Sequence, residues 1–159
     1  MNPIDMKWVS VSDDALKRVD QAAEFLQNEF CPDDSEPIWS GDYFRWKLGE
    51  LNPAGGGYLS LAMINGSIVG TVSLTCKRMI INGAECLGGE VGDTFTSAKI
   101  RRRSTPKHLS LLDSDPQSFI NRSIFGRLAS EVRERAQADG IKIIYGTPNK
   151  NAYPGWVKR

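Results

Sequence analysis

The sequence predicts a single α/β domain of the α+β type over residues 1–159, with a mixed, mostly antiparallel sheet flanked by helices on both faces. Three observations lead to this class. A chain of 159 residues with 40% hydrophobic and 25% charged residues is typical of one globular domain. Two Asn-Gly pairs separate apolar runs, which is the strongest short signal for β-hairpins. An amphipathic helix followed at once by a short apolar strand predicts a crossover to a parallel strand.

The first third of the chain predicts one strand and two helices. Weak alternation predicts a strand at Lys7–Val11. Ser12 can cap a helix that ends at Cys31-Pro32. Its apolar residues recur at helical spacing: Leu16, Val19, Ala23, Leu26 and Phe30. A second, shorter helix is expected over Ser40–Gly49, before a loop rich in glycine.

Three strands follow in the middle of the chain. We expect them at Tyr58–Ile64, Ser67–Cys76 and Glu85–Thr96. The turns between them are Asn65-Gly66 and Asn82-Gly83. Because each turn is short, consecutive strands should pair antiparallel.

The last third holds a long connection, a helix and a strand. Residues 97–120 contain Arg101-Arg102-Arg103 and His108, and a connection of this length is usually functional or disordered. We expect a helix over Ser123–Asp139, since Gly140 suits its end. The apolar segment Ile141–Tyr145 then predicts a strand parallel to Glu85–Thr96.

Composition argues against several classes of function. A net charge of +1 gives no global attraction to a polyanion, and no stacking aromatics interleave with the arginine run, so a nucleic-acid partner is disfavoured. Three cysteines and one histidine match neither a disulfide framework nor a zinc site, so no metal is expected. No apolar run approaches the roughly 20 residues of a membrane span, and no signal peptide is visible. These features predict a cytoplasmic protein.

Two segments suit a phosphorylated cofactor. Residues 121–126, Asn-Arg-Ser-Ile-Phe-Gly, open the last helix, and a helix amino terminus binds anions through free backbone N–H groups. Taken alone, the segment fits an ordinary capped helix with a solvated arginine better. Gly88, Gly89 and Gly92 in one strand indicate either a close approach of a ligand to the backbone or a β-bulge without a ligand. The two interpretations have equal weight.

In combination, these segments resemble the GCN5-related N-acetyltransferase superfamily. The resemblance lies in Gly-Asp-Thr-Phe-Thr at 92–96, Ile-Phe-Gly-Arg-Leu at 124–128, and Tyr-Gly-Thr-Pro-Asn at 145–149 followed by Tyr-Pro-Gly-Trp. It covers roughly residues 58–156. The superfamily's pyrophosphate signature, Arg/Gln-x-x-Gly-x-Gly/Ala, is imperfect here, because Gly126 is the one glycine that remains nearby. Arg101-Arg102-Arg103 is similar to the basic start of that signature.

The chain stops at Lys158-Arg159, where members of the superfamily usually continue through a helix and two strands. We therefore expect a truncated domain: a fragment, a chain completed by another chain, or a degenerate protein. An uncovered sheet edge would invite pairing between copies, which predicts a homodimer.

The resemblance implies acetyl-coenzyme A (acetyl-CoA) as co-substrate. The strand ending in Phe95 and Thr96 would pair with the pantetheine arm through its backbone. The other implied cofactor-binding residues are Arg101, Arg102, Arg103, Asn121, Arg122, Ser123, Ile124, Phe125 and Asn149. Tyr153 would protonate the departing thiolate, although a packing aromatic beside Trp156 is an equal alternative.

A general base is sought among two carboxylates of the glycine-rich strand, Glu90 and Asp93. In a regular strand these positions face opposite sides, so only one can point into the site unless a bulge intervenes. Glu90 is the better candidate because it lies deeper in the strand. A carboxylate on a solvated face is the slightly favoured alternative.

The sequence thus predicts an N-acetyltransferase that acts on the amine of a small molecule, such as an amino sugar. An alternative of another class is a non-catalytic acyl-CoA-binding or scaffold domain of the same fold. A third is a nucleic-acid-binding module that acts through the arginine run.

Overall fold

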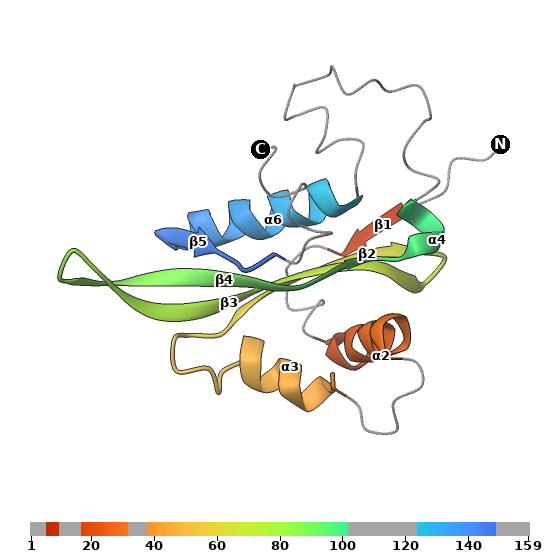
Figure 1. Ribbon diagram of the computed structural model, residues 1–159, viewed down its shortest axis with the longest axis horizontal. Coiled ribbons are helices and arrows are strands. Elements are labelled where there is room, and N and C mark those ends of the chain that lie inside the picture. Colours follow the sequence, from red (N-terminus) through yellow and green to blue (C-terminus); the bar gives the residue numbers. More distant parts are fainter. Residues whose placement is uncertain (1–5, 10–16, 32–37, 102–123, 149–159) are drawn as a thin grey trace, which may run out of the picture.

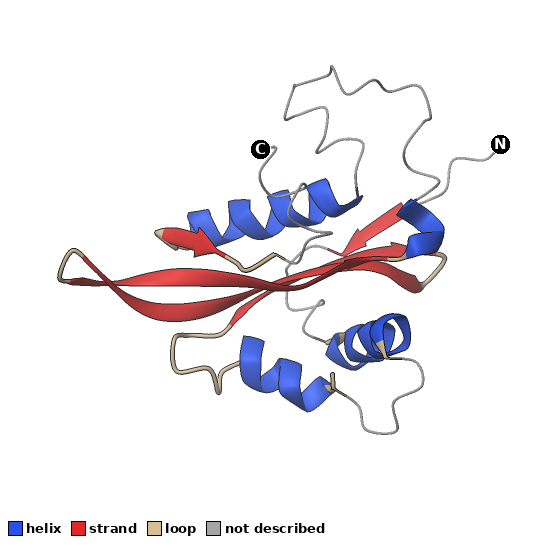
Figure 2. Ribbon diagram, viewed as in Figure 1, coloured by secondary structure: helices blue, strands red, loops and turns tan. Residues whose placement is uncertain are grey.

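A five-stranded sheet with helices on both faces forms the body of the computed structural model, which describes residues 6–9, 17–31, 38–101 and 124–148 (Figures 1 and 2). The strands lie side by side in chain order: β1 (Met6–Val9), β2 (Gly57–Ile64), β3 (Ser67–Ile81), β4 (Ala84–Thr96) and β5 (Ile143–Tyr145). Strands β1 to β4 pair antiparallel, and β5 pairs parallel with β4. The predicted fold class and the parallel crossover are confirmed.

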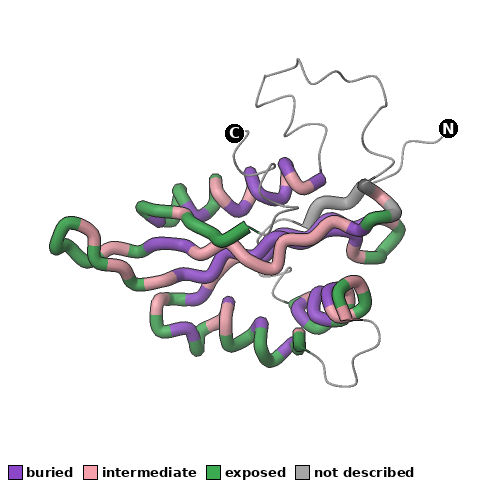
Figure 3. The backbone as a smooth tube through the Cα atoms, viewed as in Figure 1, coloured by how far each residue is buried: buried purple, intermediate pink, exposed green. Residues whose placement is uncertain are grey.

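Both predicted hairpin turns are present. Their residues have positive φ angles of 50° and 80° at Asn65-Gly66 and of 52° and 80° at Asn82-Gly83. Two consecutive left-handed residues match the twist of the flanking strands. Pairing continues up to the second turn, where Ile81 lies opposite Ala84, so β3 extends past the predicted end at Cys76. The tip of this hairpin is exposed (Figure 3).

The helices form two layers around the sheet. Helix α2 (Val19–Phe30) and helix α3 (Gly41–Leu48) cover one face, and α6 (Ile124–Ala138) covers the other (Figure 1). Helix α3 begins as predicted, because the side chain of Ser40 accepts a hydrogen bond from the Tyr43 amide. Helix α2 is shorter than predicted and starts at Val19, whereas Ser12 lies outside the described residues. The short helix α4 (Ala98–Arg101) was not predicted.

Each face of the sheet has its own apolar core. On the α6 face the core contains Val72, Leu74, Leu128, Val132 and Ala136 among its buried residues. On the other face it contains Leu26, Phe44, Leu48, Leu59 and Leu61. Glycine permits close packing at Gly89, where a Cβ atom would lie 2.4 Å from Cδ2 of Leu74. Part of the glycine content of β4 thus serves packing within the sheet.

The described residues contain no helix long and apolar enough to cross a membrane and no cluster of three metal-ligating side chains. Cys31, Cys76 and Cys86 form no disulfide with one another in the described part of the chain. Burial raises the pKa of the Cys76 thiol, so this cysteine stays protonated and is a poor nucleophile at neutral pH.

Candidate functional site

The pairing of strands β4 and β5 extends over three residue pairs in the described part of the chain. The last pair joins Glu90 and Tyr145, and no further pair between the two strands occurs in the described part of the chain. At the next residue, Gly146, a Cβ atom would lie 3.3 Å from the Val91 carbonyl oxygen, so glycine suits the close passage of the departing chain. Strand β4 continues from Val91 to Thr96, a length of about 16 Å at the usual rise per residue. Among the described residues, the edge of β4 that faced β5 therefore has no strand partner beyond Glu90.

A β-bulge interrupts β4 in this same stretch. Gly92 lies opposite Ser73 and Phe95 lies opposite Thr71, so Asp93 and Thr94 together oppose a single residue of β3. Asp93 has a φ angle of 44°, in the left-handed region that aspartate tolerates better than most residues. The bulge redirects the Asp93 side chain.

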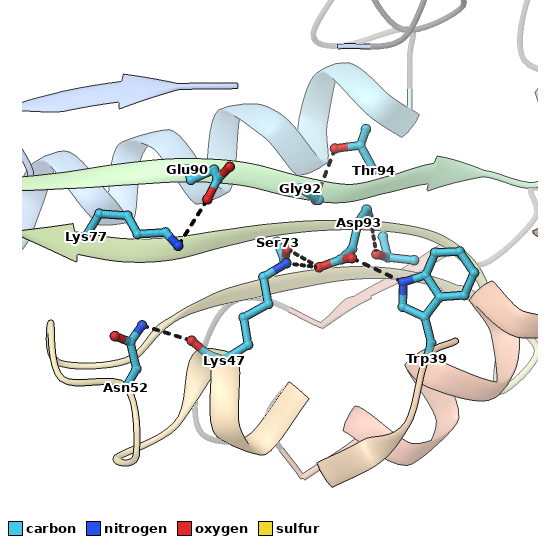
Figure 4. Close-up of polar contacts among 10 residues, drawn as sticks. Trp39, Lys47, Asn52, Ser73, Lys77, Glu90, Gly92, Asp93 and Thr94 are labelled. Atoms are coloured by element: carbon cyan, nitrogen blue, oxygen red, sulfur yellow. Dashed lines mark hydrogen bonds and ion pairs between the residues drawn. The ribbon is translucent and has the colours of Figure 1, made fainter. Parts of the chain in front are cut away.

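Three donors from three segments hold the Asp93 carboxylate (Figure 4). Nε1 of Trp39 donates to Oδ1 over 3.2 Å. Nζ of Lys47 and Oγ of Ser73 each donate to Oδ2 over 2.6 Å. The ion pair is shielded from solvent, since the side chains of Lys47 and Asp93 are only 14% and 9% exposed. Asp93 is therefore a buried, fully engaged carboxylate.

Glu90 lies on the same face of the sheet as Asp93. Glu90 and Gly92 point to the same face because side chains alternate along a strand. A Cβ atom at Gly92 would lie 3.2 Å from Nζ of Lys47, so this is the face covered by α3. The Asp93 side chain also reaches Lys47, so the bulge brings it to this face as well. The sequence placed these residues on opposite faces of a regular strand unless a bulge intervened, and the bulge at Asp93 is that exception. Glu90 forms an ion pair with Lys77 at 3.2 Å, and both side chains remain more than two-fifths exposed. Of the two carboxylates, Glu90 is the one that a solute can reach.

The first turn of α6 lies over the far end of β4. A Cβ atom at Gly70, which pairs with Thr96, would lie 3.0 Å from Cγ2 of Ile124. The Ile124 side chain is buried in the α6-side core, and Phe125 packs against the same core. The side chains of these two residues therefore serve packing.

Of the remaining predicted site residues, Phe95 and Arg101 are described by the structure and seven are not. The Phe95 ring packs edge-on against Phe25 and Phe30, with ring centroids 5.9 Å and 4.6 Å apart, so Phe95 too would meet a ligand with its backbone. Arg101 is the last residue of α4. The others lie outside the described residues: Arg102, Arg103, Asn121, Arg122, Ser123, Asn149 and Tyr153.

Sequence reasoning missed Trp39, Lys47 and Ser73 as partners of Asp93. Trp39 and Lys47 are 54 and 46 residues from Asp93 in the chain, and no short-range pattern reports such contacts. One local signal was available. An aspartate directly after a glycine within an otherwise regular strand pattern indicates a left-handed residue and hence a bulge.

Comparison with solved structures places this arrangement among known folds. No protein-family model and no curated protein sequence matches the chain. Glucosamine-6-phosphate N-acetyltransferase from Arabidopsis thaliana superposes over 96% of this chain and 88% of its own, with a TM-score of 0.61 and 10% identity. A predicted acetyltransferase from Clostridium acetobutylicum, solved with acetyl-CoA, covers 96% and 87%, with a TM-score of 0.59 and 15% identity. An aminoglycoside acetyltransferase from an uncultured soil sample, solved with trehalose, covers 97% and 86%, with a TM-score of 0.61 and 13% identity.

The chain has the GCN5-related N-acetyltransferase fold. This confirms the resemblance found in the sequence at the level of the fold, which is what identities of 10–15% can establish. The matches give no evidence for the expected truncation, because they extend over 86–88% of the acetyltransferase chains.

Proposed function

We propose that this protein transfers an acetyl group from acetyl-CoA to the amine of a small molecule. The observation that carries the proposal is the end of β4–β5 pairing at Glu90–Tyr145, followed in β4 by a bulge and then by the start of α6 near Thr96. A fold alone does not imply an activity, so the argument rests on what this site offers to each part of the two substrates.

The backbone of the site suits acetyl-CoA. The pantetheine arm has two amides and can pair with an open strand edge as a short peptide does. The edge of β4 from Val91 to Thr96 is of suitable length and has no partner strand on the β5 side in the described residues. A helix amino terminus is the kind of backbone that binds a pyrophosphate, and α6 begins at Ile124, near the Thr96 end of β4. Residues 101–103 remain the predicted partners of the 3′-phosphate.

The side chains of the site suit acetyl transfer. The acceptor must arrive as a neutral amine, and Glu90 is the accessible carboxylate that can take its proton, directly or through water. Asp93 is unsuited to this role because three donors already occupy its oxygens. The amine nitrogen forms a bond to the thioester carbonyl carbon, the carbon–sulfur bond breaks, and the thiolate takes a proton. Tyr153 remains the predicted donor of that proton.

An amine carried on a sugar is the acceptor class that we favour. Two of the structural neighbours are described as acting on glucosamine 6-phosphate and on aminoglycosides. The ion pair of Glu90 with Lys77 would offer such a molecule both a hydrogen-bond acceptor and a donor beside the reacting amine. A homodimer and a cytoplasmic location complete the proposal as predictions from the sequence.

Thermal unfolding with ligands tests the cofactor assignment. Millimolar acetyl-CoA should raise the melting temperature, and adenine nucleotides should raise it less, because a ligand that binds only the native state stabilises it by mass action. An unchanged melting temperature with acetyl-CoA would remove the basis of the proposal.

Release of free CoA thiol in the presence of a panel of amines and amino sugars tests the transfer. We expect amine-dependent thiol release that Glu90→Gln lowers by at least tenfold, since general base catalysis contributes about 10²–10⁴ in rate. Binding of acetyl-CoA without transfer to any amine would favour the alternative of a non-catalytic acyl-CoA-binding domain.

A further inference from the structure

We propose that Lys47 is a positioning residue for acetyl transfer: by holding Asp93, it fixes the orientation of the Asp93–Thr94 peptide at the bulge of β4. This inference rests on the proposed function and concerns a residue of α3 that belongs to no predicted site. The residue reaches the open part of β4 from a different layer of the molecule (Figure 4).

The peptide group that joins Asp93 to Thr94 is fixed through both the side chain and the main-chain oxygen of Asp93. The Asp93 carboxylate takes hydrogen bonds from Lys47, Ser73 and Trp39. The main-chain oxygen of Asp93 accepts a hydrogen bond from Oγ1 of Thr71 over 2.6 Å. In a planar trans peptide the C=O and N–H groups point in opposite directions. The amide N–H of Thr94 therefore points away from Thr71 and from β3.

This amide lies in the part of β4 that no longer pairs with β5. A backbone N–H in such a place can polarise the carbonyl of a thioester that lies along the strand edge. The value of such a donor depends on its position, because an error of about 1 Å can cost roughly 10²-fold in rate. The groups that fix the bulge should therefore affect the turnover rate, because they set the position of the Thr94 amide.

Of the groups that hold Asp93, Lys47 should affect the conformation of the bulge most. Asp93 holds a left-handed conformation, which few residues adopt without support. The Lys47 ammonium is its only charged partner in the described residues, and both side chains are largely shielded from solvent. Lys47 also lies over the ring of Tyr43, 5.4 Å from its centroid, which fixes the approach of the ammonium from α3. Without this cation the carboxylate would be left buried and uncompensated, and the bulge would rearrange to expose it.

Two lysine variants and a matched control test the proposal. Lys47→Met keeps an unbranched side chain one atom shorter than lysine and removes its charge, whereas Lys47→Arg keeps the charge. Arg45→Met is the control, because Arg45 lies on the same helix, is half exposed and pairs with Asp20 and Asp42 at the surface. We expect Lys47→Met to lower kcat about 10- to 100-fold, with the Kd for acetyl-CoA within about threefold of wild type since most cofactor contacts lie elsewhere. Lys47→Arg should recover part of kcat, and Arg45→Met should match wild type.

A second variant separates positioning from stability. In Lys47→Met/Asp93→Asn both charges are gone, and removal of a whole buried pair is often neutral for stability. The melting temperature should therefore return toward wild type while kcat stays low. A folded Lys47→Met with kcat within twofold of wild type would overturn the proposal. So would a double variant in which kcat recovers together with the melting temperature.

A measurement that needs no turnover tests the same claim. In ¹⁵N-labelled protein, the Thr94 amide resonance should shift in Lys47→Met and stay in place in Arg45→Met. If wild type transfers no acetyl group, the transferase assignment fails, and the Thr94 resonance still decides whether Lys47 orients this peptide. An unmoved Thr94 resonance in Lys47→Met would overturn it.

Discussion

The middle of β3 is equally buried on its two faces, yet the two faces are chemically different. Toward α6 it presents Val72, Leu74 and Cys76, which are at most 5% exposed. Toward α2 and α3 it presents Thr71, Ser73 and Thr75, which are buried to the same extent. Apolar side chains on the first face need only space and close packing. Hydroxyl groups on the second face need partners, and two of the three find theirs on Asp93.

The comparison indicates that the α6 face mainly stabilises the sheet, while the hydroxyl-lined face fixes the shape of β4. A buried polar group is costly unless its hydrogen bonds are made, so such a face is retained where geometry matters. The bulge at Asp93 and Thr94 lies beside β3 in the sheet, three residues past the last pair of β4 with β5.

The largest expected effect comes from Asp93→Ala. It would leave Lys47 buried without a counter-charge and remove the acceptor of Ser73 and Trp39. Breaking a buried ion pair in this way costs about 3–5 kcal/mol. Chemical denaturation monitored by circular dichroism would measure the loss. A loss below about 1 kcal/mol, as for an exposed pair, would mean that the hydroxyl-lined face contributes little.

The apolar face should respond to added volume. A Cβ atom at Gly89 would lie 2.4–2.9 Å from three atoms of the Leu74 side chain, so Gly89→Ala overfills this face. We expect a destabilisation of about 1–3 kcal/mol. The double variant Gly89→Ala/Leu74→Ala should be less destabilised than the sum of its single variants, because truncation of Leu74 makes room for the new methyl group. An additive result would place the strain elsewhere.

A substitution at Thr75 should stabilise the protein, unlike the substitutions at Asp93 and Gly89. Its buried Oγ1 has no hydrogen-bond partner in the described part of the chain, whereas Oγ1 of Thr71 donates to Asp93. A buried hydroxyl without a partner costs about 1–3 kcal/mol, so Thr75→Val should raise the melting temperature and Thr71→Val should lower it. Differential scanning calorimetry of the two variants would measure this contrast. Equal destabilisation by both would show that Thr75 also has a partner.

The smallest expected effect appears in alkaline solution. Burial, and then the hydrogen bond to Asp139, raises the pKa of the Tyr58 phenol above its ordinary value near 10. The folded state thus favours the protonated phenol, while the unfolded chain ionises first. The stabilisation is complete below pH 10 and is lost as the pH rises beyond it. The free energy of unfolding should fall more steeply above pH 10 in wild type than in Tyr58→Phe, and parallel profiles would contradict this.

Local patterns in the sequence predicted the elements of this fold well. Asn65-Gly66 and Asn82-Gly83 require left-handed turns, and Ser40 caps α3, so these boundaries depend on neighbouring residues alone. The order of β2 to β5 then followed from the short turns and from the single crossover before β5, whereas the place of β1 beside β2 was not predicted.

The site was less predictable for a physical reason. Alternation gives the face of a strand residue only while the strand is regular, and the extra residue at Asp93 changes that face. The contacts that stabilise the bulge come from Trp39 and Lys47, far away in the chain. Only the assembled tertiary structure brings them together.

The parallel pairing of β4 with β5 also has a kinetic consequence. The hairpins of β2, β3 and β4 close through two-residue turns, whereas the Glu90–Tyr145 contact closes a loop of about 55 residues at a larger entropic cost. The stabilisation gained by pairing β5 with β4 is small, because β5 has three residue pairs and both Ile143 and Tyr145 are 38% exposed. We therefore expect β5 to dock late in folding and to exchange its amide hydrogens through local opening sooner than β3 does. The two strands that line the candidate site would then belong to different cooperative units, and a ligand lying between them would join those units into one.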